Sequence, residues 1–158
     1  MTVVVSRLPD DFSRWDELLE LITRCFAYMD GVIEPPFSAH RLTPALLRDK
    51  AGVETCFVAS AEGRLIGCIF VAERPETLYV GKLAVDERMR GHGIGRALMQ
   101  AAERHALEYG KPVLELQTRI ELVGNHTTFA RMGFIEVART AHDGFDRPTS
   151  ITFRKVIA

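Results

Sequence analysis

The sequence lacks the features that mark disulfide-bonded, metal-binding and membrane-spanning proteins. Its three cysteines, Cys25, Cys56 and Cys68, are odd in number, far apart and without a C-x-x-C pair or a nearby histidine, so neither a disulfide framework nor a metal site is expected. No apolar run reaches about 18 residues, and the first residues have neither the basic start nor the cleavage site of a signal peptide. These absences predict a cytoplasmic protein with no membrane partner.

An excess of either charge is also missing. The chain has 20 Lys and Arg against 21 Asp and Glu, a formal net charge of -1, which gives no global reason to expect a nucleic acid partner. The 47% of hydrophobic and 26% of charged residues are typical of a globular protein. A length of 158 residues favours one domain, residues 1–158, with an ordinary core.

Hydrophobic spacing and turn residues define the expected elements. Strands are predicted over residues 2–8, 54–60, 64–73, 77–85, 113–118, 134–141 and 150–156, and helices over residues 13–29, 44–50, 94–109 and 124–132. Ser13 and Asp16 resemble a capping box, and Thr43 before Pro44 resembles an N-cap. The strand-helix-strand unit from Thr77 to Thr118 predicts a parallel crossover, and the other neighbouring strands predict hairpins. The expected class is α+β, with a mixed, mostly antiparallel sheet flanked by helices.

A glycine-rich turn before the third helix has the most specific chemistry in the chain. It reads Arg90, Gly91, His92, Gly93, Ile94, Gly95 and Arg96. Glycines permit positive φ and close approach of a ligand, and the free N–H groups at a helix start suit a phosphate. The two arginines add positive charge, so the turn predicts a ligand that carries a polyphosphate.

Two common phosphate-binding motifs do not match this turn. A P-loop requires Lys followed by Ser or Thr after the glycines, and that pair is absent. A dinucleotide fingerprint requires a third glycine where Arg96 stands, and the repeated βαβ context is also missing. A dinucleotide-dependent enzyme would remain an option only if NAD bound better than coenzyme A.

The stretch from Leu83 to Gly95 resembles motif A of the GNAT superfamily of acetyl-CoA-dependent N-acetyltransferases, whose signature after a strand is Arg or Gln, two residues, Gly, one residue, and Gly or Ala. The segment from Phe129 to Phe134 resembles a later family segment that ends in Gly-Phe. The order of elements over almost the whole chain is also similar to the GNAT fold.

This resemblance implies a binding site for acetyl-CoA as cosubstrate. Backbone groups of Leu83, Ala84 and Val85 would pair with the pantetheine arm like an added strand, and a backbone N–H there would polarise the thioester carbonyl. The N–H groups from Arg90 to Arg96 would hold the pyrophosphate. Asn125 is a further candidate for pantetheine contact, with a role as a helix N-cap or turn residue as the alternative.

The resemblance also implies direct acetyl transfer to a primary amine, on a small molecule or a peptide, which must lose a proton. Tyr79 stands where histone-type members carry a Glu, and Phe129 stands where many members carry a Tyr that protonates the leaving thiolate. Neither usual group is present. The candidates that remain are Tyr79, Glu121 and His126.

Three further expectations concern the acceptor, the assembly and the activity. The loop over residues 28–38 contains Tyr28, Asp30, Glu34 and Phe37, which would suit a cationic amine through charge and cation–π attraction. A homodimer is expected from the resemblance, with the last two strands as a pairing surface. The alternative to an enzyme is a non-catalytic acyl-CoA-binding module or regulator with the same fold.

Overall fold

The computed structural model describes residues 2–36 and 41–158. Its strands form a seven-stranded sheet with the order β1-β2-β3-β4-β5-β7-β6. The strands are β1 (Val3–Arg7), β2 (Thr55–Ala61), β3 (Arg64–Glu73), β4 (Thr77–Val85), β5 (Val113–Arg119), β6 (Ile135–Thr140) and β7 (Ser150–Val156). β4 and β5 are parallel, and the other neighbours are antiparallel. The expected α+β class and the parallel crossover are therefore confirmed.

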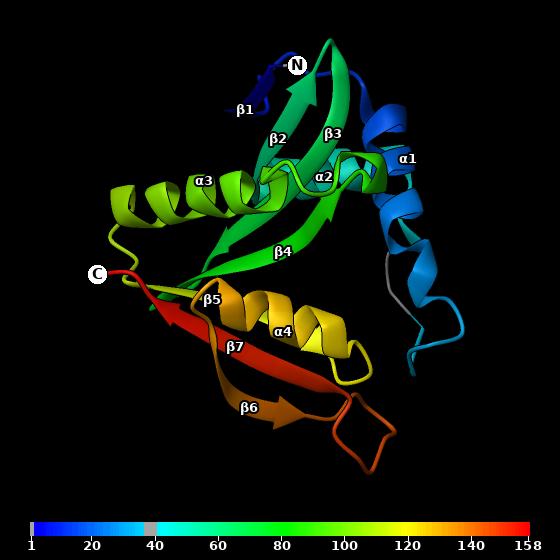
Figure 1. Cartoon of the computed structure of the whole chain (residues 1–158), viewed down its shortest axis with the longest axis vertical. Coiled ribbons are helices and arrows are strands. Elements are labelled where there is room, and N and C mark those ends of the chain that lie inside the picture. The colour runs from blue at the N-terminus through cyan, green and yellow to red at the C-terminus, as the bar shows by residue number, and fades with distance from the viewer. Residues whose placement is uncertain (1, 37–40) are drawn as a thin grey trace.

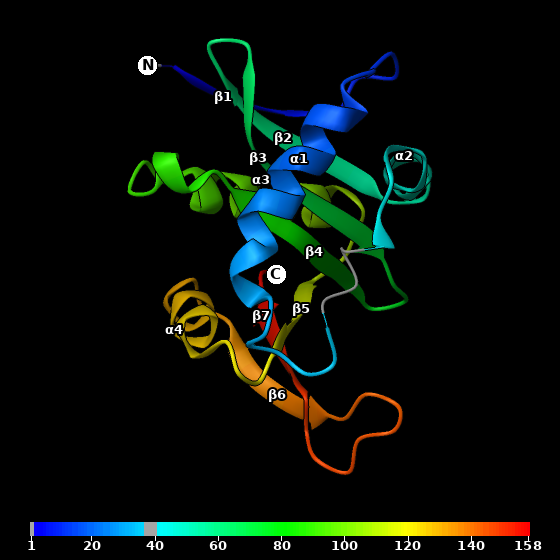
Figure 2. The same ribbon diagram turned by 90° about the vertical axis from the view of Figure 1, so that its right-hand side faces the viewer.

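Helices cover both faces of the sheet (Figures 1 and 2). The helices are α1 (Trp15–Phe26), α2 (Pro44–Val53), α3 (Ile94–Glu108) and α4 (Val123–Arg131), with short 3-10 helices η1 (Ala27–Met29) and η3 (Glu87–Met89). α3 packs on one face, with α4 beside it, and α1 lies across the opposite face together with α2. None of the described helices has the length and hydropathy needed to cross a membrane.

The start of α2 follows the capping signal in the sequence, and the start of α1 does not. α2 begins after Thr43, whose hydroxyl accepts a hydrogen bond from the Leu46 N–H at 3.1 Å, as expected for an N-cap before proline. The capping box at Ser13 is wrong, because α1 has Arg14 as its N-cap and no side-chain cap. Arg14 instead binds Glu17 and the Gly63 carbonyl, which ties this helix start to the turn between β2 and β3.

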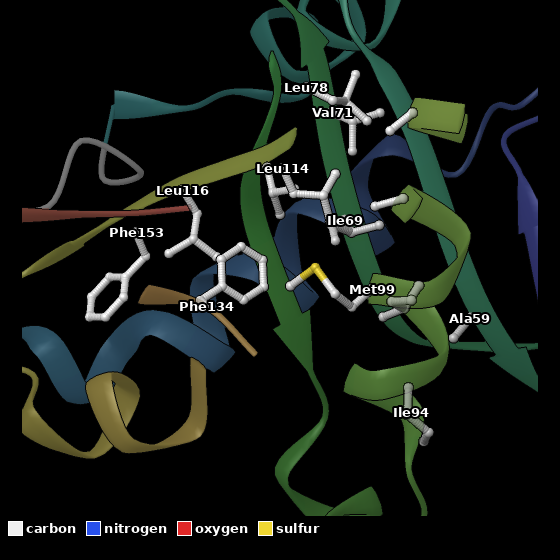
Figure 3. Close-up of a cluster of buried hydrophobic side chains, with 14 of the residues drawn as sticks. Ala59, Ile69, Val71, Leu78, Ile94, Met99, Leu114, Leu116, Phe134 and Phe153 are labelled. Carbon is white, nitrogen blue, oxygen red and sulfur yellow. The ribbon is translucent and has the colours of Figure 1, made fainter. Parts of the chain in front are cut away.

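The larger core lies between α3 and the sheet (Figure 3). Ile94, Leu98 and Ala102 of α3 are each at most 2% exposed, as the helical spacing predicts. Tyr109, the last residue of the helix predicted over residues 94–109, is the C-cap of α3 and is 49% exposed. In Figure 3, Leu116, Phe134 and Phe153 extend the same cluster toward β5 and β7. A second cluster fills the space between the sheet and helices α1 and α2.

Candidate active site

The site begins where β4 and β5 separate. The two strands pair from Thr77 opposite Val113 to Val80 opposite Leu116. Beyond that point β4 continues to Val85 beside β3, and β5 continues to Arg119 beside β7. The facing edges of β4 and β5 therefore diverge and leave backbone groups without a strand partner. An extended ligand can add to such an edge as a strand would.

A β-bulge lies in β4 at this separation. Ala84 pairs with Cys68 and Gly81 pairs with Phe70, so one β3 residue faces both Lys82 and Leu83. Lys82 has φ +50°, a conformation that a side chain with a Cβ rarely adopts. The bulge changes which residues face α3. Leu78 and Val80 face α3 before the bulge, and Leu83 and Val85 face it afterwards.

A pocket of about 310 Å³ occupies the separation. Its described lining comes from α1, η1, α2, β4, β5, α4, β7 and the segments before α4 and after β6. It consists of Phe26, Met29, Lys50, Tyr79, Val80, Gly81, Lys82, Leu83, Leu116, Gln117, Thr118, Arg119, Leu122, Asn125, Phe129, His142 and Ser150. The Thr118 hydroxyl is buried without a hydrogen-bond partner among the described residues. Because a buried polar atom normally has a partner, this hydroxyl fits a pocket that receives a polar ligand.

The glycine-rich turn follows β4 and leads into α3. Gly91 and Gly93 have φ +83° and +72°, and Gly93 is the N-cap of α3. A Cβ at either glycine would meet no atom within 4 Å, so the surface beside them is open. Within the described residues, the N–H groups of residues 91–96 make no backbone hydrogen bond. This row of free donors at the start of a 15-residue helix is suited to an anionic group.

Asp86 holds the start of this turn in place. Its carboxylate accepts hydrogen bonds from the backbone and guanidinium of Arg88 and from Arg24, and its side chain is 3% exposed. The hydrogen bonds from Arg88 lower the pKa of Asp86 to about 2 despite its burial. The turn is therefore attached to both the end of β4 and helix α1. Arg90 and Arg96 are exposed beside it.

Of the three candidates for proton transfer, Tyr79 lines the pocket. The Arg74 guanidinium carbon lies 3.9 Å from the centre of the Tyr79 ring, and burial raises the pKa of the phenol above its ordinary value. Tyr79 therefore keeps its proton at neutral pH and can donate it.

Glu121 and His126 lie outside the residues that line the pocket. One oxygen of Glu121 accepts a hydrogen bond from the Glu34 N–H at 3.0 Å, and the other is buried without a partner in the described part of the chain. His126 Nε2 lies 3.0 Å from the carbonyl oxygen of Arg119. The first contact attaches Glu121 to the segment around Glu34, and the second attaches His126 to the end of β5.

Asn125 lines the pocket, and its Nδ2 lies 3.5 Å from the Tyr28 hydroxyl. It lies inside α4, whose N-cap is Leu122, so it is not the cap of that helix. Two members of the expected acceptor loop, Asp30 and Glu34, are exposed and do not line the pocket. Phe37, the fourth member, lies outside the described residues.

The basic lining was not anticipated from the sequence. Lys50, Lys82, Arg119 and His142 come from separate segments, so no local spacing connects them. One signal was available for Lys82, because the apolar alternation of β4 moves by one residue between Val80 and Leu83, as a bulge requires. The described residues include no group of three or more His, Cys, Asp and Glu side chains that could hold a metal ion.

Comparisons with known proteins agree with this architecture. An uncharacterized N-acetyltransferase of Methanocaldococcus jannaschii is 31% identical over 93 residues, 56% of this chain and 41% of that protein. The L-2,4-diaminobutyric acid acetyltransferase of Bordetella parapertussis is 38% identical over 69 residues, 41% of this chain and 37% of that protein. The matched segments thus span about two fifths of these relatives' own lengths.

The same fold is found in solved structures. An acetyltransferase of the GNAT family from Staphylococcus aureus superposes with a TM-score of 0.77 and 13% identity, over 99% of this chain and 100% of that one. The family model described as "Acetyltransferase (GNAT) family" matches residues 15–134, which include the diverging strands, the glycine-rich turn and all of α4. The chain therefore belongs to the acetyltransferase (GNAT) family.

Proposed function

We propose that the protein transfers the acetyl group of acetyl-CoA directly to a primary amine in a ternary complex. The observation that carries this proposal is the arrangement of two features in one segment. The diverging edge of β4 offers unpaired backbone groups, and the turn that follows it offers the free N–H groups of residues 91–96. An extended arm that ends in a pyrophosphate matches this order of features.

Each part of the site has a specific role in this proposal. Leu83, Ala84 and Val85 pair with the pantetheine arm through their backbone. The turn from Arg90 to Arg96, which contains Gly91, His92, Gly93, Ile94 and Gly95, binds the pyrophosphate through N–H groups and arginine charge. Asn125 and the unpartnered hydroxyl of Thr118 supply polar contacts from the opposite wall.

Bound acetyl-CoA supplies a thioester whose carbonyl carbon accepts the amine nitrogen. A backbone N–H near the bulge of β4 stabilises the charge that develops on the carbonyl oxygen. The three thiols of the chain are poor nucleophiles for a covalent route, because burial raises the pKa of Cys25, Cys56 and Cys68 above the ordinary value of a thiol. The Cys25 thiol also donates to the Val85 carbonyl at 3.2 Å. Direct attack by the amine is therefore favoured.

Tyr79 is our choice for the group that protonates the leaving thiolate. It lines the pocket, and its raised pKa keeps the phenol protonated at neutral pH. A proton donor in the transition state contributes about 10²–10⁴-fold in rate. Phe129 lines the same pocket but has no proton to donate. That position is the observation that favours the second candidate, a non-catalytic acyl-CoA-binding module.

The acceptor class follows from the family and from one relative. The Bordetella parapertussis protein is named for acetylation of L-2,4-diaminobutyric acid, a molecule with primary amines. Of that substrate, we adopt only the primary amine as the acceptor group proposed for this chain. We also propose that residues 1–158 act as one acetyltransferase domain, since one sheet contains strands from β1 to β7.

A calorimetric titration with acetyl-CoA tests the proposal, with coenzyme A, NAD and ATP as comparators at the same salt concentration. Selective micromolar binding is expected. Gly93→Pro should weaken it more than tenfold, because proline cannot adopt φ +72° and removes an N–H at the turn, and each lost charge-assisted hydrogen bond costs about 1.5–3 kcal/mol.

Gly63→Pro is the matched control, since Gly63 has φ +78° in the turn between β2 and β3. It should alter stability without a specific loss of acetyl-CoA affinity. Equal affinities of wild type and Gly93→Pro would overturn the assignment of the turn. Binding without transfer to any amine would favour the non-catalytic module.

A further inference from the structure

The walls of the pocket carry basic side chains and no acidic one among the described residues. Lys50 comes from α2, Lys82 from the bulge of β4, Arg119 from the end of β5 and His142 from the segment after β6. All four belong to elements far apart in the sequence, and the fold brings them to one cavity. A pocket for a cationic acceptor would be expected to contain a carboxylate instead.

The charge of Arg119 is not neutralised by a close carboxylate. Its guanidinium donates to the carbonyl oxygens of Pro35 at 2.8 Å and Pro36 at 3.4 Å. No carboxylate of the described residues lies within ion-pair distance of it. Glu121 acts on Arg119 only from farther away. A guanidinium has five N–H donors, so Arg119 retains donors for a further acceptor.

Lys82 adds a second positive charge on the wall formed by β4. Its side chain is half-buried, and burial followed by the repulsion of Lys50 lowers its pKa to about 8. At neutral pH it is therefore mostly protonated. The Lys50 ammonium is already paired with Glu54 at 2.6 Å, so its charge is largely neutralised at short range. Lys82 and Arg119 stand on the two strands that border the pocket, and burial lowers the pKa of each, so a bound anion would stabilise both charges.

We propose that the acceptor is a small amino acid whose carboxylate binds between Lys82 and Arg119 while its amine accepts the acetyl group. This inference rests on the proposed acetyl transfer and names the substrate class of the same pocket. Arg119 suits a carboxylate because its planar fork can donate two parallel hydrogen bonds. The cations of β4 and β5 stand on the two strands that border the pocket.

The size of the pocket agrees with a small acceptor. A volume of about 310 Å³ lies at the lower end of the roughly 300–1,000 Å³ found for small-molecule sites, and the acetylated end of the cosubstrate must share it. A free amino acid fits these limits better than a folded protein surface does. The carboxylate of a bound amino acid would also offset the cost of placing basic side chains in a partly buried wall, because a negative charge reduces the repulsion between them.

The test compares each amino acid with its carboxamide, which retains the amine and nearly the same size but removes the negative charge. We expect kcat/KM to be about 10- to 100-fold higher for the amino acid, the range of one charge-assisted hydrogen bond. Lys82→Met should reduce this ratio toward one, mainly through KM, and Lys82→Arg should restore it in part. Arg119→Lys keeps the charge but removes the fork, so it should reduce the ratio less.

Lys111→Met is the matched control, because Lys111 lies on the loop before β5 and its ammonium contacts only the Pro75 carbonyl, at 3.5 Å, within the described residues. It should leave the ratio unchanged. A wild-type ratio near or below one would overturn the proposal, even if transfer to amines is efficient. A ratio that survives both Lys82→Met and Arg119→Lys would overturn the assignment to these residues.

A binding measurement separates failure of this inference from failure of the proposed activity. If acetyl-CoA binds but neither member of any pair is acetylated, the transfer activity is refuted. Calorimetry with the amino acid and its carboxamide, in the presence of coenzyme A, still measures the anion preference. Binding of the amino acid that is weakened by Lys82→Met would support the site, and equal binding of the pair would refute it.

Discussion

Gly67 of β3 allows α3 to lie close to the sheet, and its replacement by alanine tests how the glycine-rich turn is held. A Cβ at Gly67 would lie 3.0 Å from Leu98 Cδ1, 3.1 Å from the Ala84 carbonyl oxygen and 3.2 Å from Ile94 Cγ2. Ile94 and Leu98 belong to the first turns of α3 and are at most 2% exposed. Because the Ala84 oxygen is strand backbone, the helix must move instead.

We expect Gly67→Ala to lower the free energy of unfolding by about 1–2 kcal/mol. Overpacking of a core costs about 1–3 kcal/mol, and the gain from replacing a strand glycine by alanine offsets about 0.5–1 kcal/mol. Urea unfolding can be followed by the fluorescence of Trp15, the one tryptophan of the chain. With an m-value of about 2 kcal/mol/M, the midpoint should fall by roughly 0.5–1 M.

The same variant should bind acetyl-CoA less tightly, because displacement of α3 also displaces the N–H groups of residues 94–96. Gly52→Ala is the control. A Cβ at Gly52 in α2 would meet no atom within 4 Å, so this change should stabilise the protein by up to about 1 kcal/mol and leave affinity unchanged. An unchanged midpoint together with unchanged affinity in Gly67→Ala would refute the reasoning.

Two further predictions concern Asp86 and Tyr79. The folded pKa of Asp86, about 2, is below its ordinary value of 3.8, so its contribution of about 2 kcal/mol is complete above pH 4 and is lost as the pH falls through 2. Asp86→Asn should therefore unfold at lower urea than wild type at pH 7, with a difference that closes toward pH 2; a constant difference would contradict this origin. Tyr79→Phe should lower kcat about 100-fold or more while acetyl-CoA affinity is retained, because the ring still packs under Arg74. Unchanged kcat, with loss of activity in Glu121→Gln or His126→Gln instead, would assign the proton transfer elsewhere.

The strands were predicted well because their signals are local. β3, β4 and β7 begin and end at the expected residues, since β-branched residues fill them and turn residues bound them. The start of α1 was not predicted, because Arg14 is held by Glu17 and by the distant Gly63 carbonyl rather than by a local cap. The helix also ends earlier than its periodicity suggests and continues as η1.

The candidate site also has one part that local sequence signals predict and one part that they do not. The turn from Arg90 to Arg96 is contiguous in sequence, so its glycines and helix start could be predicted together. The basic pocket is not contiguous in sequence, because Lys82 and Arg119 line one pocket only through the parallel pairing of β4 with β5 and the bulge in β4 where the strands separate. A loop with carboxylates suggested a cationic acceptor, whereas the described lining of the pocket contains basic side chains and no carboxylate.

The limited pairing between β4 and β5 also bears on how the protein unfolds. Within the described residues, the strand pairing between the β1–β4 half of the sheet and the half made of β5, β7 and β6 is limited to Thr77–Val80 opposite Val113–Leu116. A seam of this kind is expected to open in local fluctuations before either half loses its own hydrogen bonds. Amide protons along the two halves should therefore exchange as separate cooperative units, and a ligand that bridges the seam should merge them into one.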